Sequence, residues 1–186
     1  MLRVIVPRPI AWVSTMSPES VANVAPFSFF TGVGSRPPSV LFCPANRPDG
    51  LRKDTLRNIE RTGEFVVNVV PCALVEQMNA SSAELAASES EFAHCGLTPI
   101  DSRRVAVPRV AESPVQLECK LMQSIHIGTG PGGANVVIGH VVHLHIDDAI
   151  IDTKGLVDQD LLDAVGRMGG VSYCRTRDRF DVPRPD

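Results

Sequence analysis

Most of the apolar residues in this chain lie in short runs that are rich in β-branched side chains and alternate in part with polar positions. Runs of this kind are typical of strands that bury one face. They predict strands at residues 10–15, 39–42, 65–70, 115–127 and 135–146. In the first strand, alternation places Ala11, Val13 and Thr15 on one side and Ile10, Trp12 and Ser14 on the other.

Helical patterns are confined to three shorter segments, residues 53–61, residues 73–87 in one or two pieces, and residues 158–165. Most of the fifteen prolines and fourteen glycines stand between these segments, as turn residues do. Long strands with only short helices between them predict a closed antiparallel barrel decorated by helices. We expect residues 1–186 to form a single domain, in which the charged, proline-rich tail 177–186 wraps a surface or a partner subunit.

Composition narrows the class of protein. With 44% hydrophobic residues, 21% charged residues and a net charge of −3, the chain is an ordinary globular protein without the basic stripe of a nucleic-acid-binding protein. No apolar run approaches the ~20 residues that span a bilayer. The odd number of cysteines and the absence of a CxxC pair argue against a disulfide framework or a zinc site. We therefore expect a cytoplasmic protein with no membrane or nucleic-acid partner.

The loop at residues 128–134 reads GTGPGGA and contains the spacing GxGxxG. That spacing binds dinucleotides only where a helix follows the glycines and points its N-terminus at the pyrophosphate. Here the following sequence is NVVIGHVVHLHI, which has the pattern of a strand. The loop is therefore predicted to be the tip of a hairpin.

The segment RPDGLRKDTLRN at residues 47–58 places Arg52, Lys53 and Thr55 at the opening of a predicted helix. The free N–H groups and the positive end of the dipole make a helix N-terminus attractive to phosphate. The alternative is that Asp49 or Asp54 caps the helix and that the basic side chains are solvated.

The segment NVAPFSFF at residues 23–30 contains Pro26, which is compatible only with a bend or with an edge strand. Asn23 and Ser28 bracket this position and offer polar groups to the edge of a planar ring. Alternatively, the segment is a strand followed by an aromatic cluster of the three phenylalanines. Ser14 and Thr15 are likewise either ligands at a strand end or turn residues. A site for a flat body and a site for an anionic tail together describe flavin mononucleotide (FMN).

His143 and His145 share one face of a predicted strand, which is a metal-ligand spacing. Asp147 and Asp148 follow them, but no further ligand has suitable spacing. Cys43 and Cys95 lack the His–Asp arrangement that activates a nucleophile. We therefore predict neither a metal site nor an obligate catalytic side chain.

The three segments PRPIAWVST, NVAPFSFF and RPDGLRKDTLRN, in this order, resemble the flavin reductase-like, FMN-binding split-barrel family. The resemblance extends over nearly the whole chain through FVVNVV, AESPVQLEC, VVHLHIDDAI and VPRP. It implies a six-stranded antiparallel split barrel, a homodimer, and FMN held without a covalent bond near the dimer interface.

The resemblance also implies roles for eleven residues. Ser14 and Thr15 would lie on the strand that lines the flavin. The ring or ribityl region would contact Asn23, Ala25, Pro26, Phe27 and Ser28, and the phosphate would contact Arg52, Lys53, Asp54 and Thr55.

The chain departs from the family pattern in two places. Only six residues precede PRPIAWVST, so we expect either that the start codon is misplaced or that the family's preceding strand is short, with an exposed edge. The Gly-Asp-His turn of many flavin reductases is replaced by HIGTGPGGANVVIGH.

The resemblance implies an NAD(P)H:flavin reductase that transfers hydride from nicotinamide C4 to flavin N5, with a monooxygenase or another redox protein as partner. The flavin would carry the chemistry. The first alternative is a non-enzymatic FMN protein that a partner reduces. The second is an oxidase or a haem-handling protein, suggested by His126, His140, His143 and His145.

Overall fold

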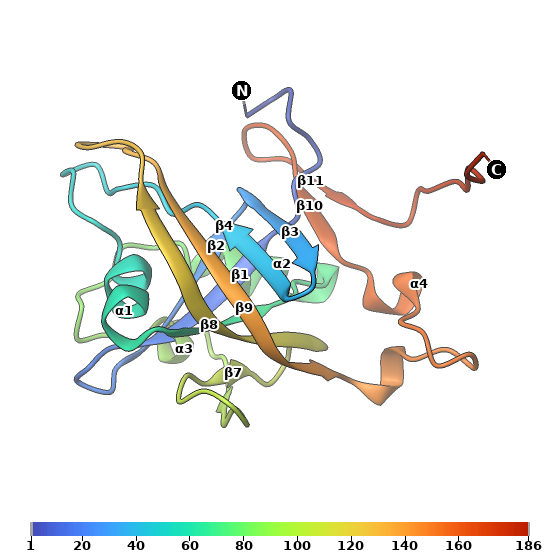
Figure 1. Cartoon of the computed structure of the whole chain (residues 1–186), viewed down its shortest axis with the longest axis horizontal. Helices are drawn as coiled ribbons and strands as arrows, with labels where there is room; N and C mark the ends of the chain where they lie inside the picture. The colour runs from blue at the N-terminus through green and yellow to red at the C-terminus, as the bar shows by residue number, and fades with distance from the viewer. Residues whose placement is uncertain (1, 186) are drawn as a thin grey trace.

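The computed structural model describes residues 2–185, which form one large antiparallel sheet with short helices around it (Figure 1). The strands follow the order β2-β1-β5-β8-β9-β4-β3. Their bounds are β1 Ala11–Met16, β2 Ala22–Phe27, β3 Phe30–Ser35, β4 Pro38–Phe42, β5 Glu64–Asn68, β8 Val115–His126 and β9 Asn135–Ile146. Within the described residues no strand pairing joins β2 to β3, so the barrel stays open along this line.

The main sheet has seven strands, one more than the six expected. The additional strand is β3, whose sequence FTGVGS contains two glycines and leaves most of its residues exposed. It pairs only with β4, and the register shifts between Gly32 and Gly34. A short, exposed, glycine-containing edge strand leaves almost no hydrophobic pattern, which is why it was not predicted.

The longest strands, β8 and β9, form a hairpin that crosses the middle of the sheet (Figure 1). The glycine loop at 128–134 is its tip, with positive φ angles at Gly130 and Gly132. The predicted hairpin is thus confirmed, and no helix follows the glycines as a dinucleotide site would require.

The strand β1 separates two cores, as its alternation predicted. Ala11 and Val13 face the barrel interior, where Phe42 and Phe65 pack against helix α1, Asp54–Thr62. Trp12 points out of the barrel and is buried under the segments that follow β5. These segments are η1 Cys72–Leu74, α2 Val75–Ala80 and α3 Glu91–His94, so the helix predicted at 73–87 ends at residue 80.

The remaining elements are short. Strands β6 Pro99–Ile100 and β7 Arg109–Val110 form one hairpin, and β10 Val165–Arg167 and β11 Tyr173–Arg175 form another. After η2, Asp148–Ile150, helix α4 covers only Gln159–Leu162 because Asp163 takes a left-handed φ of 44°. Val165 therefore belongs to β10, and the helix predicted at 158–165 is too long.

The chain ends are placed by ionic and backbone contacts. Residues 2–6 form turns and no strand, so the expected short first strand is not formed. Arg8 instead makes a bridge to Arg167 of β10. The tail runs past α4, where Arg177 contacts Asp163 at 3.0 Å and Arg179 contacts Asp160 at 2.7 Å. No helix among residues 2–185 has the length and apolar character needed to cross a membrane.

Candidate functional site

A pocket of ≈ 60 Å³ lies between the edge strand β2, the start of α1 and the loop 81–85. We call it the central pocket. It brings together seven of the eleven residues predicted for the flavin, which are far apart in the sequence. Its predicted lining residues are Asn23, Ala25, Pro26, Phe27, Lys53, Asp54 and Thr55.

The backbone of β2 provides one wall of the central pocket. β2 pairs with β1 along one of its edges. Val24 of β2 stands opposite Ser14 of β1, but its N–H points away from β1 and donates to Glu91. Because bonded and non-bonded pairs alternate along an antiparallel ladder, Pro26 also has its backbone directed outward. A proline is tolerated there because no N–H is required, and its carbonyl oxygen faces the pocket side.

A buried polar network lies at one end of this wall and ties the strands to α1. The Asn23 Oδ1 accepts hydrogen bonds from Thr15 at 3.2 Å and from Thr55 at 2.9 Å. Asn58 Nδ2 donates to Thr15 Oγ1 at 3.1 Å, and Asn23 Nδ2 donates to Glu91 Oε2 at 2.9 Å. The side chains of Thr15, Thr55 and Asn23 are therefore occupied by one another, and they position the wall of the pocket.

The N-terminus of α1 provides the second wall and carries positive charge. Lys53 is the N-cap residue, and no side chain caps the helix. Within residues 2–185, Lys53 has no carboxylate within ion-pair distance. Asp49 accepts the Leu51 N–H at 2.8 Å, and so it does not cap the helix. The first-turn N–H groups and the ammonium together make this end of α1 a candidate site for an anion.

The carboxylate of Asp54 does not cancel this charge, because two arginines hold it. Arg47 and Arg57 both contact it, from the preceding turn and from the next turn of α1. Arg47 also lines the central pocket. Sequence reasoning missed Arg47, which lies at the start of the PDG turn and returns toward the helix through the bond from its backbone N–H to the Leu51 carbonyl at 2.8 Å.

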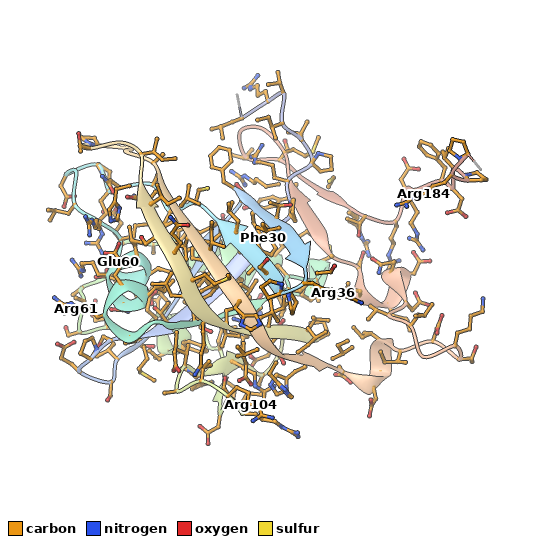
Figure 2. All side chains as sticks on the ribbon, viewed as in Figure 1. Phe30, Arg36, Glu60, Arg61, Arg104 and Arg184 are labelled. Carbon is orange, nitrogen blue, oxygen red and sulfur yellow. The ribbon has the colours of Figure 1, made fainter. Side chains whose placement is uncertain are left out.

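Four of the predicted residues lie outside the central pocket. Ser14 points to the opposite face, where its hydroxyl donates to the Pro108 carbonyl at 2.6 Å. Arg52 pairs with Glu60 at 2.7 Å on the side of α1 that faces the end of β8, where Glu60, labelled in Figure 2, also accepts from Ser124 at 2.9 Å. Thr15 is buried in the network, and Ser28 lines the neighbouring hollow.

Two larger hollows adjoin the central pocket along β2. One, of ≈ 460 Å³, shares Asn23, Asp54 and Glu91 with it and is also lined by Arg57 and Arg61. We call it the acidic hollow after its four carboxylates, Glu19, Asp54, Glu89 and Glu91. The other, of ≈ 200 Å³, shares Pro26 and Ser82 with it. We call this one the arginine hollow, after Arg167. The central pocket is too small for a flavin by itself, but the row of three hollows follows a strand about 20 Å long.

Glu91 is an acid buried beside the central pocket, with 7% of its surface exposed. Burial raises the pKa of its carboxyl, and the hydrogen bonds from its own backbone, from Val24 and from Asn23 lower it only in part. Nothing in the local sequence marked this residue, because its environment is created by contacts between α3 and β2.

The histidines do not assemble a metal site. The rings of His143 and His145 are 4.5 Å apart, and His145 Nε2 lies 2.5 Å from Glu118 Oε1. Glu118 is also bonded by the backbone N–H groups of Arg103 and Arg104. The described residues contain no group of three or more side chains suited to hold a metal ion. Glu118 thereby connects the loop around residue 104 to β8, and His145 contacts this carboxylate from β9.

The fold is an open antiparallel barrel in which the uncapped start of α1 lies beside the exposed edge of β2. The family model for the flavin reductase like domain matches residues 1–171. The chain therefore belongs to the flavin reductase-like family, and the split-barrel fold expected from the sequence is confirmed.

Individual proteins agree with this assignment. The uncharacterized protein BH2278 of Halalkalibacterium halodurans is 42% identical over 188 residues, which cover 100% of this chain and 89% of that protein. Component B of the nitrilotriacetate monooxygenase of Bacillus cereus has a TM-score of 0.91 at 33% identity, covering 97% of this chain and 90% of that one.

Two further solved structures are similar. The 2-nitrobenzoate 2-nitroreductase NbaA of Pseudomonas fluorescens has a TM-score of 0.87 at 33% identity, with 99% and 88% of the two chains covered. The flavoredoxin of Desulfovibrio vulgaris has a TM-score of 0.81 at 25% identity, with 95% and 91% covered.

The raised pKa of Glu91 predicts a pH-dependent cost of burying its charge. Glu91→Gln keeps an oxygen that can accept the Asn23 and Val24 hydrogen bonds but removes the ionisation. Because the folded pKa lies above the unfolded one, the stability that the neutral acid contributes is present at low pH and is lost as the pH rises through the folded value. The variant should therefore gain stability over the wild type as the pH rises above the usual glutamate range. Urea unfolding measured from pH 4 to pH 8 checks this, and a constant difference would contradict it.

Proposed function

We propose that this protein is an FMN-dependent oxidoreductase that uses a nicotinamide nucleotide to reduce its flavin. The observation that carries the proposal is the juxtaposition, in one pocket, of the proline-containing edge of β2 and the uncapped start of α1, where Lys53 has no ion pair among residues 2–185. Membership of the flavin reductase-like family supports the same reading.

The residues of the central pocket divide into two groups. Lys53, Arg47 and the first-turn N–H groups of α1 would hold the phosphate through charge-assisted hydrogen bonds. Ala25, Pro26 and Phe27 would lie along the flavin body, and Ser28 would meet its end in the arginine hollow. When bound, the flavin supplies the two-electron chemistry, while the protein binds it, orients it and shields it from water.

In this proposal, several of the predicted residues support the pocket without contacting the cofactor. Thr15 and Thr55 bond to Asn23 and keep β1, β2 and α1 in register, so their hydroxyls need not touch the cofactor. Asp54 holds Arg47 at the pocket. Arg52 points away, and we assign it no direct contact with the phosphate.

A second candidate is an FMN protein that a partner protein reduces. The hairpin tip at 128–134 lacks the Asp and His of the turn found in many flavin reductases, and the fold resembles that of a flavoredoxin. The similarity to component B of a nitrilotriacetate monooxygenase favours a monooxygenase as the partner that receives electrons.

We also infer that two copies of the chain associate. Three apolar side chains at the end of β8 and just beyond it, Met122, Ile125 and Ile127, are exposed by 53%, 39% and 69%. Apolar groups gathered on one strand are typical of a surface that another protein covers. A second copy is the occupant that the family resemblance implies.

Reduction of the bound flavin distinguishes the two candidates. The purified protein loaded with FMN should show the visible band of an oxidised flavin near ~450 nm, and anaerobic NADH or NADPH should bleach it rapidly if the protein is a reductase. A bound flavin that neither nucleotide bleaches would favour the partner-reduced alternative. Failure to bind FMN at all would refute both.

Lys53→Ala should weaken FMN binding tenfold or more, because a charge-assisted contact to phosphate is worth roughly 1.5–3 kcal/mol. Fluorescence titration of the apoprotein with FMN measures the loss. Arg52→Ala is the matched control: it removes one positive charge from the adjacent position but outside the pocket, so it should leave the affinity nearly unchanged. If both variants lose affinity equally, the phosphate does not sit at Lys53.

The association is tested by sedimentation velocity. The wild type is expected to sediment as a dimer, and Ile125→Glu should shift it toward the monomer by placing a charge on the covered surface. Leu161→Glu makes the same change at an exposed position of α4 and should not alter the association. A wild type that is monomeric at all concentrations would refute the inference.

A further inference from the structure

The β10–β11 hairpin places an arginine and a tyrosine side by side at the end of the flavin pocket. Arg167 and Tyr173 are directly opposite each other in the register, and the guanidinium carbon lies 4.4 Å from the centre of the ring. Both side chains line the arginine hollow. Arg167 also donates to the Gly170 carbonyl, and within residues 2–185 it has no carboxylate at ion-pair distance.

A second arginine adds positive charge behind the same hollow. Arg8 is only 5% exposed, and its guanidinium donates to the carbonyls of Leu2, Ile5 and Met168 at 2.9, 2.6 and 3.0 Å. It also donates to Ser28 Oγ at 3.4 Å, and Ser28 lines the hollow. No carboxylate among the described residues pairs with Arg8.

The two arginines are fixed relative to each other by the backbone. The Arg8 N–H donates to the Arg167 carbonyl at 3.0 Å, and the Arg167 N–H donates to the Arg8 carbonyl at 2.8 Å. A buried cation without a counter-ion is costly, and its field is weakly screened in a low-dielectric surrounding. The hollow therefore presents a preformed positive potential.

The rest of the lining is apolar or neutral and contains no acidic side chain. Ile10, Pro26, Met78 and the ring of Tyr173 supply flat, apolar walls. At ≈ 200 Å³ the hollow exceeds the volume of about 150 Å³ that is sufficient for a benzene molecule. By contrast, the acidic hollow at the opposite end of β2 has four carboxylates beside its two arginines, Arg57 and Arg61. A lining that contains an arginine and no carboxylate favours an anion in the arginine hollow.

The arginine hollow also has room beyond the flavin end. It meets a further hollow of ≈ 400 Å³ at Asn79, Arg167 and Tyr173, and Glu76 is the acidic residue in the lining of that further hollow. The hydroxyl of Tyr173 lies 3.4 Å from Asn79 Oδ1, where the two spaces join. A molecule seated against Arg167 and Tyr173 need not displace a group held at Pro26 and Ser28.

We propose that the arginine hollow binds a planar organic anion, of the class of aromatic carboxylates, as a second substrate beside the flavin. Arg167 would pair with the anionic group, Tyr173 would stack on the ring, and Arg8 would reinforce the potential from behind. The proposal rests on the proposed function, since Pro26 and Ser82 join this hollow to the pocket assigned to FMN.

The test compares benzoate with its neutral isostere benzamide by isothermal titration calorimetry on the FMN-loaded protein. We expect benzoate to bind at least tenfold more tightly than benzamide. Arg167→Gln should abolish this preference, Arg167→Lys should retain part of it, and Tyr173→Leu should weaken both ligands. Arg104→Gln makes the same charge change on a loop far from the β10–β11 hairpin (Figure 2) and should leave the preference intact.

Three results would overturn the proposal. The first two are equal affinities for benzoate and benzamide, and a preference that survives in Arg167→Gln with an unchanged melting temperature. A third is benzoate binding to the apoprotein that disappears once FMN is loaded, because the hollow would then belong to the flavin ring itself. The visible spectrum reports FMN binding independently of the calorimetry. If benzoate does not bind while FMN remains bound, this proposal alone is refuted. If FMN does not bind, the proposed function is refuted.

Discussion

The side-chain amide of Asn23 is the contact on which the candidate site depends. Its oxygen accepts from a threonine on β1 and from another on α1, and its nitrogen donates to a carboxyl on α3. All of these groups are buried, so none can exchange its partner for water without a desolvation cost. The edge of β2 and the start of α1, which are distant in the sequence, are therefore held at a constant separation. The network thus adds a polar link between the two walls to the apolar contacts that Leu56 and Ile59 of α1 make in the barrel core.

Charge is distributed unevenly along the edge of β2. Lys53 and Arg47 line the central pocket together with three acidic residues, Asp54, Glu84 and Glu91. Arg167 lines the hollow at one end of the row and Arg8 lies behind it, whereas the hollow at the other end contains carboxylates beside Arg57 and Arg61. Only the arginine hollow has a lining with a basic side chain and no acidic one, so the field of its arginine is not offset by a carboxylate of the same lining. The electrostatic character of the row is set by side chains on several segments that are distant in the sequence.

Much of the fold could be predicted from local patterns in the amino-acid sequence. The alternation at residues 10–15 assigned the two cores correctly, β9 matches its predicted bounds, and the glycine loop forms the predicted hairpin. The strand β3 was not predicted, because an exposed edge strand can form without a periodic pattern of hydrophobic residues. The site was predicted less completely, since Arg47, Glu91 and Arg167 acquire their importance only from tertiary contacts. For the same reason, sequence alone did not show that Ser14 and Arg52 point away from the pocket.

The order of the strands in the sheet determines which of them can pair while the chain is still being synthesised. As the chain leaves the ribosome, β1, β2 and β5 can pair with one another, and β3 can pair with β4, but these two half-sheets share no ladder. Only the hairpin of β8 and β9 joins them, by pairing with β5 on one side and β4 on the other. Until residue 146 has emerged, both half-sheets keep open edges of the kind that invite aggregation. The late hairpin thus decides whether a nascent chain closes on itself or associates with its neighbours.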